Sequence, residues 1–319
     1  MRKDSWIFVA GHKGLAGSAL VRALTAQGYA NIITRTHAEL DLTDQAAVRT
    51  FFQNERPEHV FLGAAKVGGI HANSTYPAEF IRINLAIETN VIHEAWAAGV
   101  DRLLFLGSSC IYPRLCPQPI SEDYLLSGPL EPTNRPYAVA KISGIEMCWA
   151  YNRQYGTRFI AAMPTNLYGP GDNYASENSH VIPALIRKMH EGKMRGAAQV
   201  VVWGSGKALR EFLSSDDMAK ACVHLFGLPK AEYDNICDPD KPPLINIGCG
   251  EELSIAELAR MVAKVVGYEG ELVFDVSQPD GMPRRLLDVS RLRALGWSPT
   301  IPLQKGLILA YQAFLQQNQ

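Results

Sequence analysis

The chain has 319 residues, of which 47% are hydrophobic and 20% are charged. This composition is that of an ordinary globular protein and excludes a globally disordered chain. The 31 Lys and Arg residues balance 32 Asp and Glu residues, which gives a formal net charge of −1. That balance excludes the basic excess that a general nucleic-acid or membrane-surface binder needs.

Apolar runs stay shorter than the roughly 18 residues that span a bilayer. The first residues, MRKDSWIFVAGHKG, lack the long apolar stretch of a signal peptide. Six cysteines are scattered without a CxxC pair, so we expect neither a metal site nor a disulfide framework. These features predict a cytoplasmic protein without a membrane partner.

Short β-like runs alternate with helical patterns in the first half of the chain. We expect strands at 6–10, 31–34, 59–62, 102–107 and 158–164. We expect helices at 15–27, at 43–55 with Thr43 as the cap, at 77–98 with Pro77 as the first residue, and at 136–155. Continuous apolar strands separated by helices predict a Rossmann-like α/β fold, with a doubly wound parallel sheet covered on both faces.

The regular alternation of predicted strands and helices ends at about residue 164. Two short strands are expected at 200–203 and 244–248, and Ser254 with Glu257 forms a capping box ahead of a helix. We therefore expect a dinucleotide-binding domain over 1–165. A smaller mixed α/β substrate domain is expected over 166–319, with the chain crossing between the two.

A glycine-rich turn follows the first predicted strand. Gly11, Gly14 and Gly17 form the pattern G-x-x-G-x-x-G, and a helical pattern comes directly after it. Glycines allow a tight turn and a close approach of the backbone to a pyrophosphate, which then sits at the helix N-terminus. The strand before the turn and the helix after it favour dinucleotide binding over an ordinary turn.

The end of the second strand indicates which dinucleotide binds. An NAD enzyme carries Asp or Glu there, but this segment reads Arg35-Thr36-His37. With Lys13 in the loop, these cations favour the 2′-phosphate of NADPH, although Arg35 and Lys13 also fit solvated surface positions. Asp41 could bond the adenine amino group or cap a turn.

Tyr137 and Lys141 stand four residues apart at the start of a predicted helix, so both reach one site. A nearby ammonium favours the phenolate, and such a tyrosine can exchange a proton with a carbonyl or an alcohol. Ser108 closes the fourth strand, at the sheet edge where ligands of open α/β sheets bind. Glycine loop, strand-end serine and YxxxK in this order predict a nicotinamide-dependent oxidoreductase.

Over almost its whole length the chain resembles the extended short-chain dehydrogenase/reductase superfamily. It is most similar to the members that make GDP-L-fucose from GDP-4-keto-6-deoxy-D-mannose by C3 and C5 epimerisation and NADPH-dependent C4 reduction. The motifs that carry the resemblance are GHKGLAG (11–17), AAKVGGI (64–70), GSSCIYP (107–113), EPTNRPYAVAK (131–141), MPTNLYGPGDN (163–173), NSHVIPALIRK (178–188), VVWGSG (201–206), REFL (210–213) and PDGMPRRLLD (279–288).

The resemblance implies that Ser108, Tyr137 and Lys141 form the reductase triad. It also implies that Cys110 and His180 are the acid–base pair of epimerisation. The chemistry agrees, because a C4 ketone acidifies the protons on C3 and C5, and inversion needs a base on one face and an acid on the other. Without the resemblance, Cys110 would fit a packing position equally well and His180 a helix cap.

The resemblance also implies two sets of binding residues. For NADP(H) these are Gly11, His12, Lys13, Gly14, Leu15, Ala16, Gly17, Arg35, His37, Leu40, Asp41, Ala64, Ala65, Lys141, Pro164, Asn166, Leu167 and His180. For the GDP-sugar they are Asn166, Lys188, Trp203, Arg210 and, of two adjacent arginines, Arg284. The chain departs from the family in offering Lys13 and His37 beside Arg35, where other members carry two arginines.

Three alternatives remain open. A 4,6-dehydratase needs a carboxylic acid beside the strand-end serine, where this chain reads Ser108-Ser109-Cys110. A 4-epimerase has no use for the Cys110 and His180 pair. A non-enzymatic NADP-binding regulator usually lacks the tyrosine or the lysine of YxxxK, and both are present.

The predicted 77–98 helix is apolar on most sides, more than one face of a sheet requires. The surplus indicates a subunit interface or a helix buried by the chain's own loops. The resemblance implies a homodimer that pairs the 77–98 and 136–155 helices in a four-helix bundle.

Overall fold

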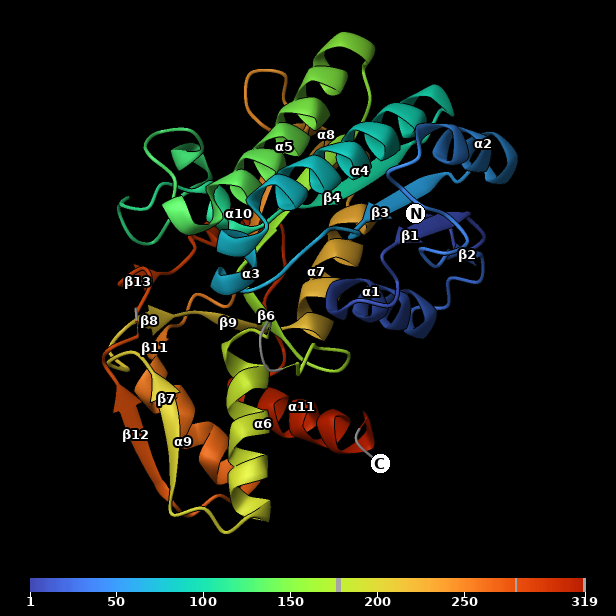
Figure 1. Ribbon diagram of the computed structural model, residues 1–319. Helices are drawn as coiled ribbons and strands as arrows, with labels where there is room; N and C mark the ends of the chain where they lie inside the picture. Colours follow the sequence, from blue (N-terminus) through green and yellow to red (C-terminus); the bar gives the residue numbers. More distant parts are fainter. Residues whose placement is uncertain (176–178, 279, 318–319) are drawn as a thin grey trace.

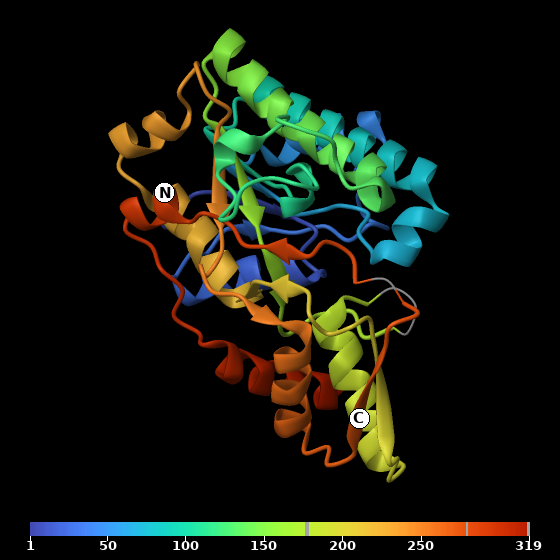
Figure 2. The same ribbon diagram turned by 90° about the vertical axis from the view of Figure 1, so that its left-hand side faces the viewer.

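The computed structural model describes residues 1–175, 179–278 and 280–317, except for the side chains of residues 70 and 71. Asn178 and Pro279, which begin two of the motifs above, lie outside the described residues. The chain forms a larger part around one parallel sheet and a smaller part below it (Figure 1). The turned view shows the same two parts, with the larger part above the smaller one (Figure 2).

Six parallel strands form the central sheet, in the order β10-β5-β4-β3-β1-β2. Five of them come from the first half of the chain, as predicted. Their bounds are β1 Ile7–Ala10, β2 Ile32–Ile33, β3 His59–Leu62, β4 Arg102–Leu106, β5 Phe159–Pro164 and β10 Leu244–Ile247. The chain order reverses between β1 and β3, which places the ligand crevice of such a sheet at their carboxyl ends.

Helices cover both faces of this sheet, which confirms the doubly wound Rossmann-like prediction. On β1, Phe8 and Ala10 belong to the hydrophobic core of one face, and Ile7 and Val9 to the core of the other. One face carries α1 Leu15–Ala26 and α7 Ser215–Gly227, and the opposite face carries α2 Gln45–Glu55, α4 Pro77–Ala97 and α5 Arg135–Tyr155. Burial on both faces explains the uninterrupted apolar runs.

The smaller part has a third hydrophobic core, built by three helices and short strands. Its helices are α6 Val181–Met194, α9 Ile255–Val266 and α11 Leu303–Gln317. Its strands pair as β6 Asn166–Tyr168 with β9 Phe212–Ser214 and β7 Gln199–Trp203 with β12 Glu271–Asp275. In a third sheet, β8 Leu209–Arg210 lies between β11 Leu253–Ser254 and β13 Arg284–Arg285 and pairs with both. The capping box of Ser254 and Glu257 begins α9, as predicted.

The connections are completed by short helices. These are α3 Ile70–Thr75, α8 Lys230–Ile236, α10 Ser290–Ala294 and the 3₁₀ turns at Ser109–Ile111, Glu122–Tyr124 and Pro132–Asn134. The chain crosses between the two parts, because β10 returns from the smaller part to extend the central sheet beside β5.

The prediction that Thr43 caps the second helix was wrong. Asp44 is the N-cap of α2, where its Oδ1 accepts the backbone N–H groups of Ala46 at 2.9 Å and Ala47 at 3.1 Å. The Thr43 hydroxyl instead donates to Asp41 Oδ1 at 2.8 Å. Both residue types are good caps, and the preceding turn decides between them.

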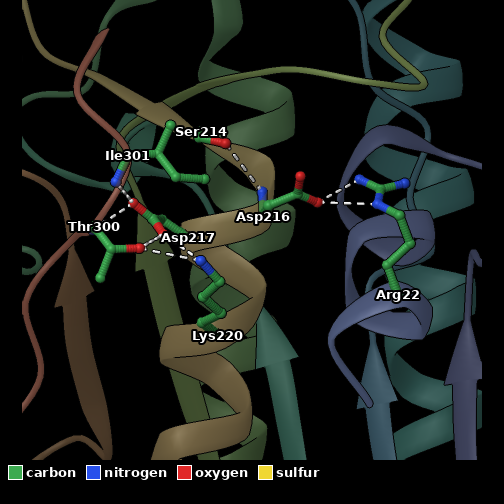
Figure 3. A network of polar contacts seen from close by, with 7 residues as sticks. All are labelled: Arg22, Ser214, Asp216, Asp217, Lys220, Thr300 and Ile301. Atoms are coloured by element: carbon green, nitrogen blue, oxygen red, sulfur yellow. Dashed lines mark hydrogen bonds and ion pairs between the residues drawn. The ribbon is translucent and has the colours of Figure 1, made fainter. Parts of the chain in front are cut away.

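Asp217 joins α7 to the segment that leads into α11 (Figure 3). Its fully buried carboxylate accepts the backbone N–H groups of Thr300 and Ile301, each at 2.7 Å, and the Thr300 hydroxyl at 2.8 Å. The neighbouring Asp216 turns the other way and forms an ion pair with Arg22 of α1 at 2.6 Å. Asp217 thus holds the segment that leads into α11, whereas Asp216 links α7 to α1.

We expect Asp217→Ala to lower the free energy of unfolding by about 3 kcal/mol, because it leaves the part-buried N–H groups of Thr300 and Ile301 without an acceptor. Asp216→Asn, the matched control, removes a half-exposed ion pair and should cost about 0.5 kcal/mol. Urea denaturation of both variants measures the difference. Equal losses in the two variants would contradict this account of Asp217.

Candidate active site

The glycine turn connects β1 to α1 at the point where the strand order reverses. Gly11 has a φ of +85°, and a Cβ on it would lie 2.8 Å from the backbone nitrogen of Ala64, after β3. A Cβ on Gly17 would lie 2.1 Å from the Gly11 carbonyl oxygen. At Gly14 the nearest atom would be 3.5 Å away. Gly11 and Gly17 are therefore required by the fold, whereas Gly14 leaves an open, exposed side.

This turn fits a dinucleotide. The open side of Gly14 lies at the N-terminus of α1, which attracts phosphate groups. Among the described residues nothing bonds His12 Nδ1, although this atom is buried. Leu15 and Ala16 begin α1, Lys13 is exposed beside the turn, and Ala64 and Ala65 line the loop after β3. The residues present therefore fit a phosphate-bearing cofactor.

The residues expected near the adenosine part have partners of their own. Arg35 forms an ion pair with Glu55 at 2.5 Å and donates to the Thr34 carbonyl oxygen at 2.8 Å. His37 is exposed, 3.8 Å from Asp41. Hydrogen bonds from the backbone and the hydroxyl of Thr43 hold the pKa of Asp41 below its usual range. Asp41 therefore stabilises a turn, and Leu40 beside it is buried in the core.

Lys141 is buried at the centre of the predicted catalytic cluster. Its ammonium donates to the Leu106 carbonyl oxygen at 3.1 Å and lies 3.2 Å from Glu88 Oε1 of α4. It also lies 5.9 Å from the centroid of the Tyr137 ring, one turn earlier on α5. The spacing of YxxxK thus brings both heads to the carboxyl end of β4, as predicted.

Ser108 and Cys110 reach the same place from the end of β4. Ser108 caps the 3₁₀ turn Ser109–Ile111, where its Oγ accepts the Cys110 backbone N–H at 3.4 Å. It also forms side-chain hydrogen bonds with Tyr137 and with Cys110. The structure therefore brings Ser108, Cys110, Tyr137 and Lys141 into one cluster.

Burial keeps the reactive groups of this cluster protonated. It raises the pKa of Tyr137 well above its usual range, and the neighbouring Cys110 and Glu88 raise it further, while Ser108 opposes the rise. Burial likewise raises the pKa of the Cys110 thiol. The hydrogen bond with Ser108 and the charge of Arg285 lower this pKa, but by less. Tyr137 is therefore a phenol poised to donate a proton, and Cys110 is a neutral thiol.

His180 is the N-cap of α6, in the smaller part of the molecule. A Cβ on Gly69, in the loop after β3, would lie 3.6 Å from the carbonyl oxygen of Ser179. The loop is thus next to the residue before His180. Desolvation lowers the pKa of His180, so the imidazole is neutral near pH 7. The described contacts do not join His180 to Cys110.

A cavity of about 170 Å³ extends the crevice into the smaller part of the molecule. Of the predicted substrate residues, Asn166, Trp203 and Arg210 line it, together with Asp280. Arg210 donates to the Asp280 carbonyl oxygen at 3.3 Å, and burial lowers its pKa to about 10. These side chains offer a cation, an amide and an indole to one ligand.

Lys188 lies beside Trp203, which lines this cavity. The Lys188 ammonium donates to the Val201 carbonyl oxygen at 3.2 Å and lies 5.1 Å from the centroid of the Trp203 ring. Trp203 is 63% exposed, which a purely structural tryptophan rarely is. An aromatic face with an adjacent cation suits a flat base bearing phosphates.

The adjacent arginines 284 and 285 point in different directions. Arg284 is exposed and forms an ion pair with Glu252 at 2.7 Å. Arg285 donates to Ser109 Oγ at 3.4 Å, next to Cys110. The structure therefore brings Arg285 to the catalytic cluster, whereas Arg284, which is predicted to bind the GDP-sugar, is paired with Glu252.

Glu211 is fully buried between the two parts of the molecule. Its Oε1 accepts the backbone N–H groups of Cys249 at 2.6 Å and Gly250 at 2.7 Å, and its Oε2 accepts that of Leu287 at 3.0 Å. Its own carbonyl oxygen accepts the Asn166 side-chain amide at 2.9 Å. Glu211 thus holds two distant backbone segments together and also holds Asn166, which lines the substrate cavity.

Sequence reasoning missed Glu88, Arg285 and Glu211. Glu88 had a signal, because it is a charged residue on the apolar side of a helix. Pro164 and Leu167, predicted to bind the cofactor, flank the crevice at the end of β5 and in β6.

Comparison with known proteins identifies the family. The NAD dependent epimerase/dehydratase family matches residues 7–247. GDP-L-fucose synthase 1 of Arabidopsis thaliana is 56% identical over 98% of this chain and 94% of its own length. GDP-L-fucose synthase of Escherichia coli K12 is 54% identical over 98% of this chain and 97% of its own length. A GDP-L-fucose synthetase of Naegleria fowleri bound to NADP superposes with a TM-score of 0.87 at 26% identity, covering 100% of this chain and 96% of that chain.

The chain therefore belongs to the NAD dependent epimerase/dehydratase family, within the extended short-chain dehydrogenase/reductase superfamily. It matches the two GDP-L-fucose synthases above over nearly their full length.

Glu211→Gln should lower the free energy of unfolding by about 2 to 3 kcal/mol, because the amide group turns a donor toward at least one buried N–H. Glu252→Gln, which removes only the exposed ion pair with Arg284, is the control and should change stability much less. Thermal or urea denaturation separates the two. An unchanged stability of Glu211→Gln would show that the three N–H groups do not depend on its carboxylate.

Proposed function

We propose that this protein is a bifunctional nucleotide-sugar epimerase and reductase, which converts GDP-4-keto-6-deoxy-D-mannose to GDP-L-fucose with NADPH. The observation that carries the proposal is the cluster of Ser108, Cys110, Tyr137 and Lys141 at the end of β4. It combines carbonyl-polarising hydroxyls with a thiol, which a simple reductase has no use for. The names and identities of the relatives support the same activity.

The glycine turn would hold the pyrophosphate of NADP(H), with Gly14 facing it and the N-terminus of α1 behind it. Arg35, Lys13 and His37 would lie toward the 2′-phosphate. The NADP in the Naegleria fowleri protein supports this choice. When bound, NADPH supplies the hydride that reduces C4.

Epimerisation would use the C4 ketone of the substrate. Ser108 and Tyr137 would bond its oxygen, so that the charge that develops when C3 or C5 loses a proton is stabilised there. Cys110 and His180 would form the acid–base pair: one takes the proton from carbon, and the other returns a proton to the opposite face. The same oxygen would then receive the Tyr137 proton during reduction, while Lys141 keeps that phenol in place.

The GDP part would bind in the cavity of the smaller part. Trp203 offers a stacking face, and Lys188 and Arg210 offer charge to the diphosphate. Asn166, held by Glu211, would border the sugar and the cofactor. We assign the remaining sugar-side cation to Arg285, since Arg284 is paired with Glu252.

Cys110→Ser should separate the two reactions. Serine is a much weaker acid than cysteine, so proton exchange at C3 and C5 should fall about 100-fold or more. Reduction should persist, and the 4-reduced but unepimerised sugar should accumulate. NADPH oxidation combined with product analysis by NMR measures both.

Cys116→Ser, six residues further along the same segment, is the matched control and should form GDP-L-fucose as the wild type does. Epimerised product from Cys110→Ser at the wild-type rate would remove Cys110 from the mechanism. A wild-type protein that does not oxidise NADPH with this substrate would contradict the proposed function itself.

We further propose that the protein works in the cytoplasm as a homodimer, with domains at 1–165 and 166–319 between which the chain crosses, since α7 and β10 return to the larger part. None of the helices in the described ranges is long and apolar enough to span a membrane. The helices α4 and α5 lie together on the outside of the larger part (Figure 1). They carry an aromatic cluster in which Trp96 and Tyr155 stack with their ring centroids 4.2 Å apart, and Tyr155 is 45% exposed.

Sedimentation equilibrium should give twice the chain mass of 35.1 kDa. Tyr155→Asp places a charge in the aromatic cluster and should weaken the dimer about tenfold or more. Met194→Asp, at an exposed position on the distant end of α6, should leave the mass unchanged. A wild-type monomer at all concentrations would reject the dimer.

A further inference from the structure

Glu88 is a buried acid for which the mechanism above has no use. It lies on α4 with 1% of its surface exposed, facing α5. Its Oε1 is 3.2 Å from the Lys141 ammonium, and Lys141 itself is only 2% exposed. Within the described part of the chain, no hydrogen-bond donor with good geometry serves either carboxylate oxygen. The ion pair with Lys141 is therefore the contact that compensates this charge.

The fold makes room for Glu88 at this position. A Cβ on Gly144, one turn after Lys141 on α5, would lie 3.2 Å from Glu88 Oε2 and 2.5 Å from Phe105. Any other residue at 144 would displace the carboxylate or the aromatic ring. Phe105 in turn has its ring centroid 4.5 Å from the Lys141 ammonium. Glu88, Phe105 and the Leu106 carbonyl oxygen thus surround the amine on three sides.

In the described part of the chain, the titratable groups that face Glu88 come from α5. They are Lys141, Tyr137 and Cys148, and each of them interacts electrostatically with Glu88. The strand beneath contributes the uncharged Phe105. On the α2 side of α4, the charges are those of a separate ion pair between Glu94 and Arg49. Glu88 therefore acts on the catalytic pair and not on a surface network.

We infer that Glu88 is a positioning residue for the C4 reduction, which holds the Lys141 ammonium beside Tyr137 and keeps it charged. The inference rests on the proposed function. A buried ammonium without a counter-ion favours loss of its proton, and an amine that is free to turn no longer fixes the phenol. The anion also raises the pKa of Tyr137, after burial and Cys110, which keeps Tyr137 in the proton-donating form.

The protonation of Glu88 gives this role a pH signature. Burial raises the pKa of Glu88 to about 7, against the attraction of Lys141. The carboxyl group is therefore neutral below about pH 7 and ionised above it. Glu88→Gln mimics the neutral form, so wild type and variant should reduce C4 at similar rates at low pH. Their rates should diverge as the pH rises, because only the wild type then holds the ammonium.

The test is kcat for NADPH oxidation across the pH range, at saturating substrate. The ratio of Glu88→Gln to wild type should fall about tenfold from the acid to the alkaline end. Glu88→Asp, which keeps the charge, should recover part of that loss. Glu94→Gln, a buried acid of the same helix, is the control and should show a ratio that does not vary with pH. A pH-independent ratio for Glu88→Gln would overturn the inference.

A second measurement does not depend on turnover. The ¹³C chemical shift of the Glu88 carboxyl group reports its titration in the folded protein. Lys141→Met removes the ammonium and should move this titration to higher pH, because the anion loses its counter-ion. An unchanged titration would overturn the inference. If the wild type proves inactive with GDP-4-keto-6-deoxy-D-mannose, the proposed function fails, while this titration still decides whether the pair exists.

Discussion

The Glu211 carboxylate is the interaction on which the geometry of the site depends. Three backbone N–H groups from two distant segments donate hydrogen bonds to it. The backbone also approaches it closely, since a Cβ on Gly248 would lie 2.3 Å from its Oε1. A buried carboxylate is costly unless its oxygens are bonded, and this one is bonded on both. Because residue 211 follows Arg210 and its carbonyl binds Asn166, the same residue that joins the two parts also orients the substrate side chains.

Desolvation gives the catalytic cluster its character. Burial keeps Cys110 and Tyr137 protonated, and partial desolvation lowers the pKa of His180, so the groups that exchange protons with the substrate are neutral at rest. The charged groups beside them are the Lys141 and Glu88 pair and the Arg285 guanidinium. In such a low-dielectric site, the negative charge that develops on the C4 oxygen is met by fixed hydroxyl donors instead of water. One set of donors then serves both epimerisation and reduction.

Much of this could be predicted from the sequence, because its strongest signals are local. Strands buried on both faces read as uninterrupted apolar runs, and YxxxK places two heads on one helix face. Other features depend on tertiary contacts. The sequence does not show that β10 returns to the first sheet. The inward turn of Arg285 and the outward turn of Arg284 follow from strand pairing with β8. The apolar neighbours of Glu88 in its helix are a signal of burial, but an acidic residue in a helix is usually solvated, and that expectation outweighs the signal.

The central claim is that one site inverts two carbons and reduces the carbon between them. Its most direct test is the reaction in deuterium oxide with unlabelled NADPH, followed by NMR of the product. The account predicts GDP-L-fucose with solvent deuterium at C3 and C5 and with hydrogen at C4. A product with deuterium at neither C3 nor C5 would contradict proton exchange by Cys110 and His180. Deuterium at C4 would contradict direct hydride transfer from the bound cofactor.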